Sequence, residues 1–183
     1  FGLDYKAEGM VYASVLRPPI FGQKLESFDA SEAKKINGVL DVITIGEKVR
    51  KYIQLGKKNW TFKLSETDKV VVIAENTWAA IKGKKALSAI WLDDTKLEST
   101  EDHDNILIKI LDTKKSNIRR EDGNVEKAFS TADKVVEKTY HSPFLPHNCM
   151  EPMNFYADVT ADKIHLVGPV QTPEYAAAVV ADM

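Results

Sequence analysis

Lys69-Val-Val-Val-Ile-Ala74 is the stretch of sequence that decides the fold of this chain. A continuous apolar run of this length predicts a strand that is covered on both faces. Asn76 or Thr77 then caps a helix that runs to about Leu87. The segment Ser88-Ala-Ile-Trp-Leu92 predicts the next strand. A strand, a helix and a second strand this close together predict a compact layered unit.

The predicted helix after Ala74 has an apolar stripe and a basic face. We expect the stripe to be buried, and it consists of Trp78, Ala79, Ile81 and Ala86. A cluster of lysines on the same helix indicates a solvated face, formed by Lys82, Lys84 and Lys85. The three tryptophans of the chain are interpreted as core residues rather than stacking platforms, namely Trp60, Trp78 and Trp91.

Outside this unit the chain alternates short strands and short helices. Apolar or alternating patterns predict strands over residues 10–16, 25–29, 39–45, 134–140, 155–159 and 163–168. Helical signals mark a short helix capped by Asp29 or Ser31 and ending at Ile36, and further helices over 106–111, 125–131 and from Thr172 onward. The lysine-rich stretch 46–66 is interpreted as an irregular excursion or a hairpin. The layout is α+β, with a boundary near residues 95–125.

Composition excludes several classes of protein. The chain has 183 residues, of which 44% are hydrophobic and 28% charged, as in ordinary globular domains. A net charge of −2 gives no general attraction to nucleic acid, and no apolar run is long enough to span a bilayer. A single cysteine, Cys149, excludes an internal disulfide framework and a cysteine-rich metal site built by this chain alone.

Residues 140–154 contain the densest group of chemically active side chains. His141, His147, Cys149 and Glu151 offer metal-ligand atoms among three prolines, but their spacing matches no zinc pattern. A thiol nucleophile formed by Cys149 with His147 is an alternative, although no helix start follows the cysteine to activate it. The simplest interpretation is a stiff polar loop beside a core.

Two polar residues stand apart as candidates for binding a ligand. Glu151 lies between apolar Met150 and Met153, where its carboxylate either ties backbone amides together or lines a polar cavity. Gln171 precedes Thr172-Pro173, a strand-to-helix junction whose free N–H groups suit an oxyanion or a phosphate-bearing cofactor. Such junctions are also often simple caps, so both interpretations stay open at this point.

Three separated blocks of the sequence resemble one family. The first is Gly9-Met-Val-Tyr-Ala-Ser-Val-Leu-Arg-Pro-Pro19, the second runs from Val70 to Trp91, and the third is Pro143-Phe-Leu-Pro-His-Asn-Cys-Met-Glu-Pro-Met-Asn154. In this order they resemble the large subunit of the xanthine dehydrogenase and aldehyde oxidase family of molybdenum hydroxylases. The isoquinoline 1-oxidoreductase type is the most similar subgroup.

The resemblance implies a fold, a cofactor and partners. It implies an α/β-hammerhead domain over residues 1–97, a charged linker over 98–124, and the first piece of a molybdopterin-binding α+β domain over 125–183. Members of this family hydroxylate an aldehyde or an N-heterocycle with oxygen from water, at molybdenum held by molybdopterin, here expected as the cytosine dinucleotide. Electrons leave through [2Fe–2S] clusters, which in the isoquinoline type lie on a separate small subunit.

The resemblance also assigns residues to the cofactor. His147, Glu151, Pro152 and Asn154 match the family's loop near the cofactor, and Gln171 matches a cofactor-side glutamine. Leu145 stands where the xanthine dehydrogenase branch has a glutamine six residues before the glutamate. The family's later glycine-rich segments and its base glutamate do not occur before Met183, so no catalytic residue and no protein ligand to the metal is expected in this chain.

The sequence is therefore expected to be a piece of a larger subunit, inactive and free of cofactor when isolated. Its compartment, bacterial cytoplasm or periplasm, is left open because any signal would precede Phe1. Exposed apolar surface is expected where missing segments would pack, at Phe144, Met150, Met153 and Tyr175. The alternative is a stand-alone binding or assembly module that has the hammerhead fold and no catalysis.

Overall fold

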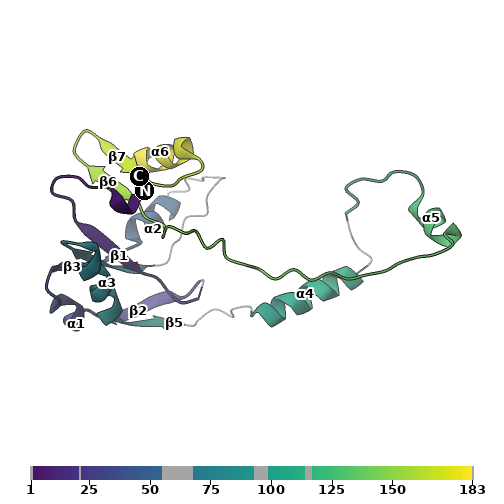
Figure 1. Ribbon diagram of the computed structural model, residues 1–183, viewed down its shortest axis with the longest axis horizontal. Coiled ribbons are helices and arrows are strands. Elements are labelled where there is room, and N and C mark those ends of the chain that lie inside the picture. The colour runs from purple at the N-terminus through teal and green to yellow at the C-terminus, as the bar shows by residue number, and fades with distance from the viewer. Residues whose placement is uncertain (1, 21, 55–67, 93–98, 114–116, 183) are drawn as a thin grey trace. The chain divides into compact units, whose positions relative to one another are not determined.

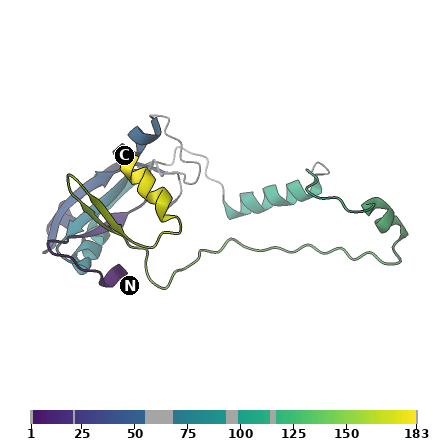
Figure 2. The same cartoon turned by 90° about the horizontal axis from the view of Figure 1, so that it is seen from above.

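The computed structural model describes residues 2–20, 22–54, 68–92, 99–113 and 117–182. Its contacts divide the chain into two compact units. The first comprises Phe1–Leu97 with Glu151–Met183, and the second comprises Glu98–Met150. Figure 1 labels the helices and strands, and Figure 2 shows them from above. Predictions that concern residues 55–66, including the place of Trp60 in a core, lie outside the described residues.

A three-stranded antiparallel sheet is the centre of the first unit. Its order is β1 (Tyr12–Leu16), β4 (Lys69–Ala74) and β3 (Val39–Ile45). The central strand β4 coincides with the apolar run predicted as a covered strand, and Val70, Val72 and Ala74 have no exposed surface. The prediction of a strand covered on both faces is confirmed, because β4 has a partner on each edge and packing on each side.

Two smaller sheets complete the strands of this unit. β2 (Lys24–Asp29) pairs antiparallel with β5 (Ser88–Leu92), with a bulge between Leu25 and Ser27. β6 (Tyr156–Val159) and β7 (Ile164–Val167) form an antiparallel hairpin through Thr160–Asp162, as predicted. Every strand pairing in the described residues is antiparallel, and helices lie among the strands. The α+β class is therefore confirmed.

Helix α3 (Thr77–Ala86) covers the central sheet. Asn76 is its N-cap, and the Asn76 Oδ1 atom accepts a hydrogen bond of 2.9 Å from the amide of Ala79. The buried side of the helix consists of Ala79, Ala80 and Gly83. The prediction that Trp78 is buried is wrong, because its side chain is 64% exposed, with the Nζ atom of Lys82 5.0 Å from its ring centroid.

The core of the first unit joins the three-stranded sheet to strand β2. Ala33, Val42, Val70 and Val72 form its buried centre. Apolar side chains from all sides pack against this centre, namely Leu16, Leu25, Phe28, Ala30, Val39, Ala86 and Leu87. Small and β-branched side chains dominate the centre, so helix α3 can approach the sheet closely.

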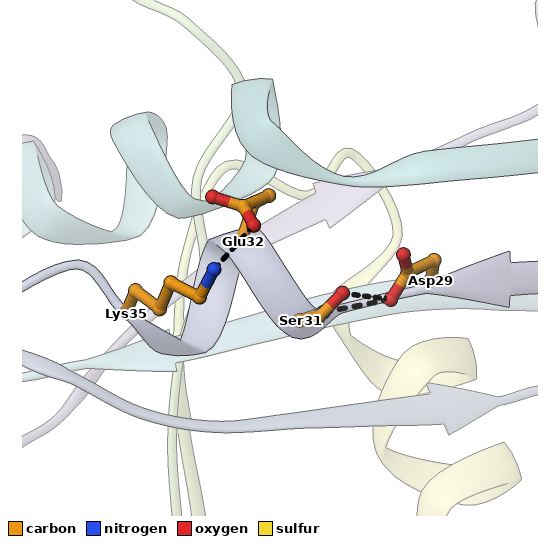
Figure 3. A network of polar contacts seen from close by, with 4 residues as sticks. All are labelled: Asp29, Ser31, Glu32 and Lys35. Carbon is orange, nitrogen blue, oxygen red and sulfur yellow. Dashed lines mark hydrogen bonds and ion pairs between the residues drawn. The ribbon is translucent and has the colours of Figure 1, made fainter.

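Helix α1 (Ser31–Lys34) has its N-cap one residue away from either predicted cap. Its N-cap is Ala30, whose methyl side chain cannot accept a hydrogen bond. Asp29 instead accepts a hydrogen bond of 2.8 Å from the amide of Ser31 and a second bond from the Ser31 hydroxyl (Figure 3). These bonds hold the pKa of the Asp29 carboxyl below its ordinary value. Asp29, two residues before Ser31, therefore fixes the backbone where the helix begins. Glu32 pairs with Lys35 at 2.5 Å.

Helix α2 (Glu47–Gln54) lies where the sequence analysis expected irregular chain or a hairpin. The prediction for this part is wrong, because the stretch has helical spacing that its lysines obscure. Glu47 and Lys51 form an ion pair of 2.7 Å one turn apart, and Tyr52 is buried. Arg50 pairs with Asp68 at the start of β4, which ties the helix to the central strand.

Helix α6 (Pro173–Asp182) ends the first unit. It begins with Pro173. The carbonyl of Thr172 accepts a hydrogen bond of 3.2 Å from the amide of Ala176, so Thr172 is in the N-cap position. Val179 is its buried residue. In both views the helix lies beside the β6–β7 hairpin (Figures 1 and 2).

The second unit contains two helices and a long extended segment. Helix α4 (Thr100–Asp112) begins with a capping box between Ser99 and Asp102, and α5 (Val125–Thr131) is capped by Asn124. None of its described residues is buried. The strand predicted over 134–140 is wrong, since these residues form no strand and pair with none in the described chain. No helix in the described ranges is long and apolar enough to cross a membrane.

Candidate functional site

Glu151 and Asn154 form the most connected polar group among the residues assigned to the cofactor. Their loop precedes β6, and Pro152 between them restricts the backbone. The Nδ2 atom of Asn154 donates to Glu151 Oε1 at 3.0 Å and to the carbonyl of Pro152 at 2.9 Å. The structure thus brings these two predicted residues together.

The second partner of Glu151 comes from the other end of the chain. The amide of Leu3 donates to Glu151 Oε1 at 2.9 Å, across a sequence separation of 148 residues. The hydrogen bond from this amide, with that from Asn154, holds the pKa of the Glu151 carboxyl below its ordinary value. The carboxylate therefore binds a backbone amide, but that amide belongs to a distant turn and not to the loop of Glu151 itself.

That distant turn is the short 3-10 helix η1 (Gly2–Asp4). A β-carbon built on Gly2 would lie 2.0 Å from Asn154 Oδ1, so the turn lies directly against the asparagine side chain. The ring of Tyr5 contacts the ring of Tyr156 on β6, with 4.6 Å between centroids. Gly2, Leu3 and Tyr5 were not predicted as site residues, and no local signal in the sequence identifies them.

Tyr156 connects this group to the hairpin. Its ring lies edge-on to that of His165 on β7, with 6.1 Å between centroids. Removal from water, followed by the charge of Asp158, raises the pKa of the Tyr156 hydroxyl. Like an ordinary tyrosine hydroxyl, it is protonated at neutral pH and can donate a hydrogen bond.

Gln171 lies at the predicted junction before helix α6 and is exposed. Its amide is accompanied by the first-turn N–H groups of a ten-residue helix, which have no partner within the helix. In the described residues no hydrogen bond joins Gln171 to Glu151 or Asn154. The amide and the helix start provide donors that suit phosphate or pterin oxygens, and they do so at an open surface.

The remaining candidates lie in the second unit or at its border. His147 and Cys149 are exposed, and His141 lies 3.2 Å from Asp104 of helix α4 through its Nε2 atom. Phe144 contacts the ring of His103 on the same helix. Among the described residues no group of three or more histidine, cysteine or acidic side chains is placed to hold a metal ion.

The expected exposure of apolar side chains is confirmed at three of four positions. Phe144 is 75% exposed, Met153 is 71% exposed, and Met150 is fully exposed. Tyr175 is only half-buried. Leu145, which stands at the family's glutamine position, is also exposed.

Comparison with known proteins points to a cofactor class. Residues 110–183 match the family model of the molybdopterin cofactor-binding domain. This range includes the proline-rich loop, Glu151, Asn154 and Gln171.

Two curated relatives span most or all of the chain. The "Membrane-bound aldehyde dehydrogenase [pyrroloquinoline-quinone]" of Gluconacetobacter polyoxogenes is 29% identical over 160 residues, which cover 86% of this chain and 19% of that protein. The "Nicotinate dehydrogenase large molybdopterin subunit" of Eubacterium barkeri is 26% identical over 212 residues, covering 100% of this chain and 46% of that protein. The chain thus spans less than half the length of either relative.

A solved structure is similar to part of the chain. The crystal structure of the Cu,Mo-CO dehydrogenase in its carbon monoxide reduced state matches 54% of this chain and 14% of its own, with 17% identity and a TM-score of 0.37. The names of the matched family and of the Eubacterium relative include molybdopterin, whereas the name of the aldehyde dehydrogenase gives pyrroloquinoline-quinone instead. The match of residues 110–183 and the name of the Eubacterium relative therefore agree on molybdopterin.

Proposed function

We propose that this chain is part of the large subunit of a molybdenum hydroxylase of the xanthine dehydrogenase and aldehyde oxidase family. The observation that carries the proposal is the match of residues 110–183 to the molybdopterin cofactor-binding domain. The alignment of the whole chain with a large molybdopterin subunit supports it. The three sequence blocks that resemble the family are spread over the chain, so the proposal does not depend on one motif.

The domain arrangement that follows is part of the proposal. Residues 1–97 would form the hammerhead domain, 98–124 a charged linker, and 125–183 the first piece of the cofactor-binding domain. The covered central strand β4 with helix α3 above it is the layered element expected of the first domain. The absence of any buried residue among the described residues of the second unit is what a segment that packs against further chain would show.

The cofactor would be held by Gln171, Glu151, His147 and Asn154. Part of this set fits the cofactor, because Gln171 and the start of α6 offer hydrogen-bond donors for phosphate or pterin oxygens. The four side chains are exposed or half-buried, so none of them is enclosed in the core of its own unit. When bound, molybdenum with molybdopterin, proposed as the cytosine dinucleotide, supplies the redox chemistry that inserts oxygen from water into a substrate C–H bond.

The proposed substrate is an aldehyde or an N-heterocycle. The names of the two relatives support both options, since one is an aldehyde dehydrogenase and the other a nicotinate dehydrogenase. The isoquinoline 1-oxidoreductase type remains our proposed subgroup. The proposed partners are the rest of the large subunit and a small [2Fe–2S] subunit, and the 183-residue chain alone would hold no cofactor and catalyse nothing.

Cofactor content of site variants tests this function. The complete subunit that contains these residues is purified with its partners, and pterin and molybdenum are measured per subunit. Gln171→Ala and His147→Ala should lower the pterin content several-fold relative to the unmodified subunit. The matched control is His141→Ala, which removes a histidine of the same loop that pairs with Asp104 and has no proposed cofactor role.

Different failures have different meanings in this experiment. An unmodified subunit without pterin would refute the function and favour the alternative of a binding or assembly module. Normal pterin content in both site variants would refute the residue assignment and leave the function intact. A subunit that contains pyrroloquinoline quinone in place of pterin would assign it to the cofactor named for the Gluconacetobacter relative.

A further inference from the structure

The side chain of Asn154 has no hydrogen-bond donor left for a ligand. A side-chain amide carries two N–H donors. Asn154 Nδ2 uses them on Glu151 Oε1 at 3.0 Å and on the Pro152 carbonyl at 2.9 Å. Its Oδ1 atom is covered by Gly2, where a β-carbon would lie only 2.0 Å away. A direct contact between Asn154 and a cofactor would therefore break bonds that the protein already makes.

The carboxylate of Glu151 is held from two sides. Its Oε1 atom accepts the amide of Leu3 at 2.9 Å in addition to Asn154 at 3.0 Å. Hydrogen bonds to an ionised carboxylate are about twice as strong as bonds between neutral groups. Two such bonds to one oxygen, from a backbone turn and from a restrained amide, fix the orientation of the carboxylate plane.

The turn that supplies the Leu3 amide has an anchor of its own. Tyr5 packs on Tyr156 with 4.6 Å between ring centroids, and Tyr156 in turn contacts His165. The amide of Tyr5 also donates to the carbonyl of Gly2 at 3.1 Å, which closes the turn. The position of the turn therefore does not depend on Glu151 alone, so the turn can act on the carboxylate as a fixed support.

We propose that the Gly2–Leu3 turn and the Asn154 side chain are positioning groups for the Glu151 carboxylate, and that Asn154, rather than holding the cofactor directly with the other three residues, influences it only through Glu151. This inference rests on the proposed function for the identity of the ligand, and on this chain's own contacts for the positioning. It assigns a role to a segment about 150 residues away in sequence from the loop it supports.

The titration of Glu151 in the 183-residue chain tests the positioning without any cofactor. The pKa of its side-chain carboxyl is measured by NMR on protein labelled with ¹³C at glutamate. Leu3→Pro removes the amide that donates to Glu151, whereas the matched control Leu3→Ala keeps it and changes only a half-exposed side chain. Asn154→Ala removes the second donor, and its matched control is Asn124→Ala, which uncaps helix α5 in the second unit.

We expect the Glu151 pKa to rise toward its ordinary value in Leu3→Pro and in Asn154→Ala, and to stay depressed in both controls. An unchanged pKa in either test variant overturns the proposal, because it requires both donors. An equal rise in Leu3→Ala and Leu3→Pro also overturns it, because the amide would then not be the cause.

A second measurement tests whether Asn154 acts through Glu151. In the complete subunit, pterin content is compared for Glu151→Ala, Asn154→Ala and the double variant. We expect the double variant to lose no more pterin than Glu151→Ala alone, and a further several-fold loss would overturn the proposal. If the unmodified subunit lacks pterin, the proposed function fails, and the NMR titration still decides the positioning.

Discussion

Gly83 of helix α3 is the position where one added methyl group tests the packing of the first unit. A β-carbon at this site would lie 2.7 Å from Val72 Cγ1 and 3.0 Å from Val39 Cγ2. Val72 is fully buried on the central strand, and valine has little freedom to rotate away. Helix α3 therefore needs a glycine here to approach the sheet.

Two opposing terms set the size of the effect of Gly83→Ala. Alanine favours the helix over glycine by about 1 kcal/mol. Overpacking a well-filled core costs about 1–3 kcal/mol, and the contact with Val72 is short enough that a shift is required. Since both valines are stiff and close, the free energy of unfolding should fall by up to about 2 kcal/mol once the helix gain is subtracted from the steric cost.

Urea denaturation followed by circular dichroism measures this change in the free energy of unfolding. The decisive control repeats Gly83→Ala in a Val72→Ala background, which costs about 2–3 kcal/mol by itself but removes the Cγ1 atom. In the Val72→Ala background the added methyl group should leave the free energy of unfolding unchanged or raise it slightly. The coupling free energy between positions 72 and 83 should then be about 1–2 kcal/mol. Equal destabilisation in both backgrounds would refute the reasoning.

Three further predictions concern a cap, a close approach and a titration. Asn76→Ala removes the side-chain bond to the Ala79 amide, and should lower the free energy of unfolding by about 1 kcal/mol in the same urea assay. Gly168→Ala places a β-carbon 2.1 Å from Phe155 Cδ2, so we expect the exposed ring to move and stability to fall by about 1 kcal/mol; unchanged ring signals in NMR would contradict this. The depressed pKa of Glu151 means that its contribution is complete above about pH 4.5 and is lost as the pH falls through the folded-state value, so Glu151→Gln should flatten the acid side of the stability–pH curve.

The strands of the first unit could be predicted because their patterns are local. The run from Val70 to Ala74 is apolar throughout, and β3 and β5 occupy the ranges expected from alternation. Helix α3 has its cap where Asn76 indicates it. Trp78 was placed wrongly because small residues fill the side of α3 that faces the sheet, and a tryptophan does not fit there.

Other elements depend on information that a short window of sequence does not contain. Helix α2 is stabilised by the Glu47–Lys51 pair and by Arg50 binding Asp68, so its charges were mistaken for those of an irregular segment. The alternating residues 134–140 have the composition of a strand but no partner within the described chain. A strand pattern states a preference for extended backbone, whereas pairing also requires an adjacent edge.

The candidate site was predictable in its residues but not in its contacts. Glu151 was singled out because a carboxylate between two methionines needs partners. The sequence indicates that such partners exist, but it does not show that one is the amide of Leu3, because any residue except proline carries the same donor. The close approach of Gly2 to Asn154 depends likewise on the fold and not on a motif.

The most direct test of the central claim is the cofactor content of the native protein that carries these residues, isolated with its partner subunits. Molybdenum is measured by mass spectrometry, and the pterin by fluorescence after oxidation. The claim predicts one molybdenum and one pterin for each large subunit. Intact, folded protein that contains neither molybdenum nor pterin would contradict it.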